Sequence, residues 1–190
     1  MAQAPYYVQT LASQKANGAI KNTYTTAATV LNPSDLTPIP GNYFQIGSKI
    51  RVRAWGGLSN IVTTPGTVTF QVNMGAVAIY SSGALQMVNV ANTLAPFVFE
   101  AVLRMASVGN STSATWIGGG FVTAQNILIT AGTGNPTITD AILAAPSGSP
   151  AAGSGYDSTT QQILDFFVGF SISNAGNGVQ LYDYQVEQLS

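Results

Sequence analysis

The side chains that carry most enzymatic chemistry are scarce in this sequence. Its 190 residues include no histidine and no cysteine. Histidine is the commonest general base and transition-metal ligand, while cysteine supplies thiolate nucleophiles and zinc ligands. Catalytic systems of the Ser-His-Asp or Cys-His type and ordinary zinc sites are therefore excluded. We expect no catalytic residues, no bound metal and no cofactor.

Carboxylates are the remaining candidates for acid–base chemistry, and all seven are scattered singly along the chain. A glycosidase needs two carboxylates within about 5 to 9.5 Å of each other. Asp183 and Glu187 share a face of one expected strand, but the strand rise separates them by about 13 Å. Asp165 and Glu100 approach each other only if their strands are neighbours. The pattern is typical of surface carboxylates, and the chain is predicted not to be an enzyme.

Five charged residues form a candidate constellation: Arg51, Arg53, Glu100, Arg104 and Asp165. In a jelly roll we expect the strand that starts at Ile163 to lie between the strands that hold Arg51 and Glu100. Asp165 would then pair with Arg51 or Arg53 on one side and with Arg104 on the other. Two interpretations are open. The set is either a subunit-interface network that fixes register and partner, or a cross-strand surface ladder worth under about 1 kcal/mol per pair.

The aromatic residues suggest a second kind of site. Trp55 and Trp116 are the candidate aromatics for an interface or a glycan, together with four tyrosines: Tyr6, Tyr7, Tyr43 and Tyr80. Aromatic rings near loops suit the stacking of sugar rings. The competing interpretation, which we favour, is that these residues lie at the edge of the core or anchor a subunit contact.

Strand signals dominate from Thr23 onward, because apolar and polar residues alternate with a period of two. The clearest strand is Thr67–Met74, with its apolar side chains on one face. Phe44 and Ile46 are expected to face inward at the start of another. The expected strands besides Thr67–Met74 are 23–31, 44–54, 77–80, 97–105, 114–124, 136–142, 163–172 and 178–189. Only residues 7–16 suit a short helical turn.

Eight to nine strands with turn-rich connections predict an all-β fold, an antiparallel two-sheet jelly-roll sandwich. Residues 1–22 are interpreted as an N-terminal arm or entry segment, and 23–190 as a single domain. The segment 144–155 is rich in Ala, Gly, Ser and Pro, and predicts a flexible loop.

The composition points to assembly. Charged residues make up 7% of the chain, against about 25% in typical soluble domains. A surface with so few charges favours association, so we expect neighbouring subunits to cover much of it. Six basic residues and a net charge of −1 do not suit nucleic acid or anionic lipid. No signal peptide or apolar span is visible, so we expect synthesis in a cytoplasm.

Three segments carry a family resemblance: 41–59, 65–75 and 95–104, with the sequences GNYFQIGSKIRVRAWGGLS, PGTVTFQVNMG and APFVFEAVLR. Together with the acidic-apolar alternation of the last strand, they resemble jelly-roll virion proteins of tailed bacteriophages. That family includes head decoration and minor capsid subunits, and tail proteins with trimeric packing like that of tumour necrosis factor. The resemblance covers about residues 23–190, and the family has no catalytic residues to carry over.

The resemblance implies a structural virion protein. The primary hypothesis is a capsid decoration or minor capsid subunit, a homotrimer that binds the major capsid protein and stabilises the phage head. The alternatives are a tail or baseplate subunit, and a carbohydrate- or receptor-binding module that uses Trp55 and Trp116. A glycan hydrolase is the least favoured alternative.

Overall fold

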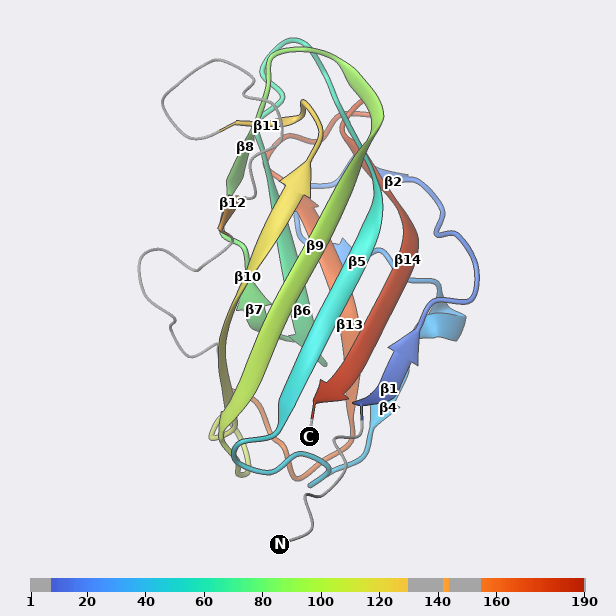
Figure 1. Ribbon diagram of the computed structural model, residues 1–190. Coiled ribbons are helices and arrows are strands. Elements are labelled where there is room, and N and C mark those ends of the chain that lie inside the picture. Colours follow the sequence, from blue (N-terminus) through green and yellow to red (C-terminus); the bar gives the residue numbers. More distant parts are fainter. Residues whose placement is uncertain (1–7, 130–141, 144–154, 190) are drawn as a thin grey trace, which may run out of the picture.

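The computed structural model describes residues 8–129, 142–143 and 155–189. In these ranges the chain forms two antiparallel sheets packed face to face (Figure 1), and the only helical element is a single 3-10 turn, η1, at Pro33–Asp35. No helix in the described part is long and apolar enough to cross a membrane. The expected all-β sandwich is confirmed.

The front sheet in Figure 1 has the order β1-β14-β5-β9-β10-β12, and β2 pairs with β14. Its strands are β1 Val8–Ser13, β2 Lys21–Asn22, β5 Lys49–Asn60, β9 Asn92–Ser107, β10 Thr115–Ala124, β12 Ile142–Leu143 and β14 Gly178–Leu189.

The back sheet has the order β11-β8-β6-β13-β3, with β4 also paired to β13 and β7 to β6. Its strands are β3 Ala28–Thr29, β4 Thr37–Ile39, β6 Thr67–Met74, β7 Val77–Ser81, β8 Leu85–Met87, β11 Leu128–Ile129 and β13 Gln162–Phe170. The order β1-β14-β5-β9 against β3-β13-β6-β8 is that of a jelly roll, and β10 extends the front sheet beyond β9.

One hydrophobic core fills the space between the sheets. Phe70 of the back sheet lies 5.2 Å from Phe97 of the front sheet, measured between ring centroids, and Phe166 lies 5.1 Å from Phe99. All four rings are buried. Within each strand, successive inward residues are two positions apart, so a period of two places these rings on the inward face.

The beginning of the chain differs from the sequence-based expectation. Residues Val8–Ser13 form β1 and not a helical turn, because the backbone pairs with the edge of β14. Of the expected strand 23–31, only Ala28–Thr29 pairs as a strand. The expected strand 136–142 and the loop 144–155 lie almost wholly outside the described residues.

The start of β5 also differs. The strand begins at Lys49, and the turn before it contains Gly47 at φ 91°. Phe44 is buried as expected, but Ile46 is 65% exposed, because this turn interrupts the alternation that the sequence continues through it. The prediction for Ile46 was wrong.

Candidate functional site

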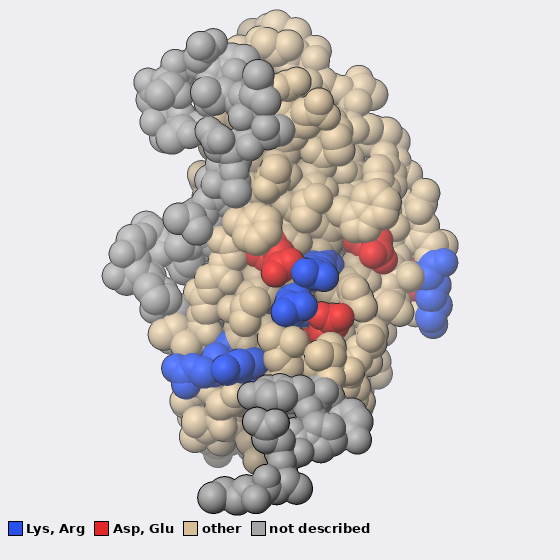
Figure 2. Space-filling model, in the orientation of Figure 1, with Lys and Arg blue, Asp and Glu red and all other residues tan. Residues whose placement is uncertain are grey.

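Figure 2 shows charged side chains of both signs gathered on the outer face of the front sheet. We call it the charged face and define it by outward residues of three neighbouring strands: Lys49, Arg51, Arg53 and Trp55 of β5, Val98, Glu100, Val102 and Arg104 of β9, and Asp183, Gln185 and Glu187 of β14. The register places Glu100 opposite Arg53, Glu187 opposite Arg51, and Asp183 opposite Trp55.

Two arginines and two glutamates neutralise one another within the chain. Arg53 Nε donates to Glu100 Oε2 at 2.7 Å, and Arg51 Nη1 donates to Glu187 Oε2 at 3.3 Å. Arg51 Nε lies 3.9 Å from Glu100 Oε1, which links the two pairs. Because the set is closed within one chain, it needs no partner subunit for charge balance. This geometry matches the surface-ladder interpretation.

The remaining two members of the predicted constellation lie elsewhere. β5 pairs directly with β9, and β13 belongs to the back sheet, so Asp165 cannot pair with Arg51, Arg53 or Arg104. A period of two predicts which face a residue takes but not which sheet its strand joins. Arg104 stands on the charged face opposite Lys49, and no ion pair to it occurs among the described residues.

Asp165 is buried on the back sheet and is held by neutral donors. Thr29 Oγ1 donates to its Oδ1 at 2.7 Å, and the backbone N–H of Phe166 donates to the same oxygen at 2.6 Å. Burial raises the pKa of this carboxyl, and the two hydrogen bonds act in the opposite direction. The group therefore serves the packing of β3 against β13.

Trp55 is the exposed aromatic of the charged face. The residue is 49% exposed, and its indole N–H donates to Asp183 Oδ2 at 3.2 Å. Tyr182 packs edge-on against the indole, with ring centroids 5.7 Å apart and an interplanar angle of 72°. A bulge in β14 between Leu181 and Asp183 sends Leu181 into the core while Tyr182 and Asp183 lie beside Trp55.

Trp116, the other candidate, is not available to a ligand. It is fully buried; its Nε1–H donates to the hydroxyl of Tyr156 at 3.1 Å, and its ring lies 4.9 Å from that of Phe44. Trp116 lies inside the core of the chain and not at its edge, so it can contact neither a glycan nor a second subunit in this structure. From the sequence alone, the apolar residues beside Trp116 in β10 allowed either a buried or an accessible side chain.

The tyrosines are also dispersed. Tyr80 is buried, which raises its pKa to about 12. Tyr43 is 36% exposed, and its hydroxyl donates to Gln188 Oε1 at 2.9 Å. Tyr6 and Tyr7 lie outside the described residues. The four tyrosines named from the sequence therefore give no aromatic platform with Trp55 in the described part of the chain.

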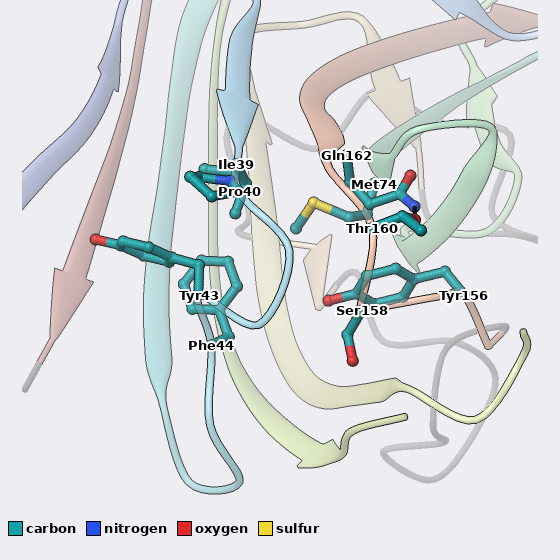
Figure 3. A pocket seen from close by; sticks show the side chains of 9 residues that line it. All are labelled: Ile39, Pro40, Tyr43, Phe44, Met74, Tyr156, Ser158, Thr160 and Gln162. Carbon is teal, nitrogen blue, oxygen red and sulfur yellow. Dashed lines mark hydrogen bonds between the residues drawn. The ribbon is translucent and has the colours of Figure 1, made fainter. Parts of the chain in front are cut away.

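The cavity drawn in Figure 3 is a packing gap. It lies between β4 and the 156–162 segment, has a volume of about 10 Å³, and is lined by Ile39, Pro40, Tyr43, Phe44, Met74, Tyr156, Ser158, Thr160 and Gln162. That volume is about what a single water molecule needs. The ring of Tyr43 points away from the Tyr156 side of the gap (Figure 3). The gap is too small for a substrate.

A larger cleft of about 510 Å³ lies at one end of the sandwich, between the end of β5, the start of β9 and the start of β14. Its lining includes no charged and no aromatic residue. Asn60 Nδ2 donates to the carbonyls of Val88 and Val90, and Asn92 Nδ2 donates to Asn60 Oδ1. These amides hold the loops together, so they are not free to bind a ligand.

Sequence reasoning missed the roles of Glu187, Asp183 and Tyr182. The sequence predicts the last strand with the bounds that the structure gives, Gly178–Leu189, but it does not predict that this strand pairs with β5. A strict alternation would also place Leu181 and Asp183 on the same face of β14. The bulge between them instead puts Leu181 in the core and Asp183 beside Trp55. No group of three potential metal ligands of the Asp, Glu, His or Cys type occurs among the described residues.

Comparisons with known proteins add little to this geometry. No protein-family model matches the sequence, and no curated protein matches it. Among solved structures, the chain is similar to the CBM2 module of the evolved Dit protein of Lactobacillus casei BL23 phage J-1, with a TM-score of 0.35 and 10% identity over 98% of both chains. A likeness this distant carries no argument about function.

Proposed function

We propose that this chain is a non-catalytic structural subunit of a bacteriophage particle that works by assembling with further copies of itself. The observation that carries the proposal is the scarcity of charge, 7% of 190 residues. More than half of the charged residues stand on the charged face. Large parts of the remaining surface therefore lack the ionic groups that keep proteins apart in solution.

The outer face of the back sheet is an uncharged surface with a shallow hollow of about 230 Å³, and it suits contact with a second copy. We call it the neutral face and define it by the outward residues Thr67, Thr69, Gln71, Phe167 and Gly169. Its carboxylate, Asp165, is buried. The centres of subunit interfaces are depleted of charged residues, so the neutral face meets that condition better than the charged face does.

The place in the particle is the finer part of the proposal. The resemblance of the 41–59, 65–75 and 95–104 segments to jelly-roll virion proteins supports a homotrimer on the capsid surface, bound to the major capsid protein, or a subunit of the tail or baseplate. Subunits that bind only the assembled lattice stabilise it by mass action, which is a mechanical function without catalysis. Electron microscopy of the parent particle with a labelled chain distinguishes head from tail.

Solution mass tests the assembly directly. The mass of one chain is 19.7 kDa, and analytical ultracentrifugation of the intact protein is expected to give three times that mass, the mass of a homotrimer. Thr69→Lys places a charge in the neutral face, where an unpaired buried ion costs several kcal/mol, about enough to separate the subunits. Thr123→Lys is the matched control, because Thr123 is a half-buried outward threonine of the front sheet. A monomeric wild-type chain, or equal effects of the two variants, would contradict the proposal.

A further inference from the structure

We infer that Trp55, Tyr182 and Asp183 form a binding site for a neutral sugar ring on the charged face. The site is independent of the surface proposed for assembly and adds a recognition function to the subunit. Three observations carry it: an exposed indole held in a fixed orientation, a backbone bulge that brings two further side chains to it, and the charge balance around it.

The indole is exposed and yet restrained. Trp55 is 49% exposed, its N–H is bound to Asp183, and the ring of Tyr182 packs against it edge-on. An isolated exposed tryptophan needs no special explanation, but one held from two sides has already lost the rotational freedom that binding would cost. The apolar C–H face of a pyranose ring packs on such a surface in the way that aliphatic groups pack on aromatic rings.

The bulge is what assembles the three residues. In regular alternation Tyr182 and Asp183 would stand on opposite faces of β14, and only one of them would reach Trp55. The extra residue between Leu181 and Asp183 brings both to the same indole. Gly56, next to Trp55, accommodates the bulge, because an added Cβ there would overlap the carbonyl oxygen of Gln180. Bulges commonly re-aim side chains at functional sites.

The polar groups beside the indole suit hydroxyl groups. The Asp183 carboxylate accepts hydrogen bonds, and Arg53, two residues from Trp55 on the same strand face, has a half-exposed side chain that donates them. The Arg53–Glu100 and Arg51–Glu187 pairs cancel. Asp183 has no ion-pair partner among the described residues and leaves a small negative charge beside the indole. A neutral sugar fits this balance, and an anionic one is repelled.

The open shape of the site suits part of a longer glycan chain. None of the hollows found in the described part of the chain includes Trp55, so the site is an open platform that contacts one or two rings of a glycan chain. A contact of that size gives a dissociation constant on the order of 1 mM for one subunit. Several copies on one particle raise the avidity, because the later contacts form within an already tethered complex.

The test uses the full chain with neutral hexasaccharides of glucose, N-acetylglucosamine and mannose, and with polygalacturonate as the anionic control. Binding is followed by tryptophan fluorescence and titration calorimetry. Because Trp116 is buried, acrylamide quenching reports mainly on Trp55. We expect at least one neutral hexasaccharide to bind and to protect Trp55 from acrylamide, and polygalacturonate not to bind.

Variants separate the site from the assembly surface. Trp55→Ala is expected to weaken binding by about tenfold or more, Trp55→Phe to retain part of the affinity, and Asp183→Asn to weaken it less than Trp55→Ala does. All three keep the sedimentation mass of the wild type. The inference is overturned if no neutral hexasaccharide binds at a concentration about 10-fold above the expected dissociation constant, or if Trp55→Ala binds as the wild type does. It is also overturned if Trp55→Ala changes the sedimentation mass, because that would assign Trp55 to a subunit contact. None of these outcomes at Trp55 decides the assembly proposal, which fails if the wild-type mass is that of one chain or if Thr69→Lys and Thr123→Lys have equal effects.

Discussion

The outer faces of the two sheets differ in whether their ionic groups are exposed to water and in what those groups bind. On the front sheet, Arg53 and Glu100 form an ion pair in contact with water, with side chains 50% and 23% exposed. On the back sheet, Asp165 is buried, accepts hydrogen bonds from neutral donors, and forms no ion pair among the residues that the structure describes. The difference indicates that the front sheet presents charge to its surroundings, whereas the back sheet removes charge from its surface. The two faces are therefore suited to different contacts.

The largest effect is expected where the two sheets meet. Phe166 of β13 is fully buried and packs between Phe99 and Tyr184 of the front sheet. Phe166→Ala should lower the free energy of unfolding by about 3–5 kcal/mol, because it removes buried apolar surface and leaves a cavity. Urea unfolding followed by tryptophan fluorescence measures the loss. Phe167→Ala, one residue along and half-buried on the neutral face, is the matched control and should cost far less.

A smaller effect is expected from the buried carboxylate of the back sheet. Because burial raises the pKa of Asp165, the folded state keeps its proton to a higher pH than the unfolded state does. This group's contribution to stability is thus complete below the ordinary pKa of an aspartate, about 3.9, and is lost as the pH rises through the raised value.

Asp165→Asn tests that sign. The amide oxygen can still accept from Thr29 and from the Phe166 N–H, but the group no longer ionises. The variant should therefore gain stability relative to the wild type between pH 4 and pH 7, by less than Phe166→Ala loses. Urea unfolding at both pH values provides the measurement. A difference that stays constant with pH would mean that Asp165 is not destabilised by its burial.

The sequence predicted the features that depend on alternation. The bounds of Thr67–Met74 and Gly178–Leu189, the inward set of β9 and the outward set of β5 all follow from a period of two, because one face of each strand is buried. Trp55 belongs to the outward set of β5 by the same alternation, and it is exposed. A two-sheet fold then follows from the number of such strands.

Features set by neighbours in space were not predictable in this way. The sheet that β13 joins depends on the path of the chain, which a period of two does not reveal. The sequence-based prediction assigned β13 to the wrong sheet, and Asp165 was therefore expected in a surface network and not at the buried position that the structure gives. The bulge at Tyr182 adds one residue to an otherwise regular pattern, so the sequence alone gave no sign that Asp183 would meet Trp55. Strands of two or three residues, such as β2 and β3, are too short to show any period.

The smallest effect is expected from the ion pair of the front sheet. Arg53 Nε and Glu100 Oε2 lie 2.7 Å apart, but both side chains reach water. A double-mutant cycle of Arg53→Gln and Glu100→Gln should therefore give a coupling of about 0.2–1 kcal/mol that declines in high salt. Arg104→Gln is the control, because Arg104 lies four residues from Glu100 on the same face without an ion pair to it.

A coupling of several kcal/mol that resists salt would mean that the pair is shielded from water in the assembled protein. The charged face would then be a subunit interface, and the contrast between the two sheets would be reversed.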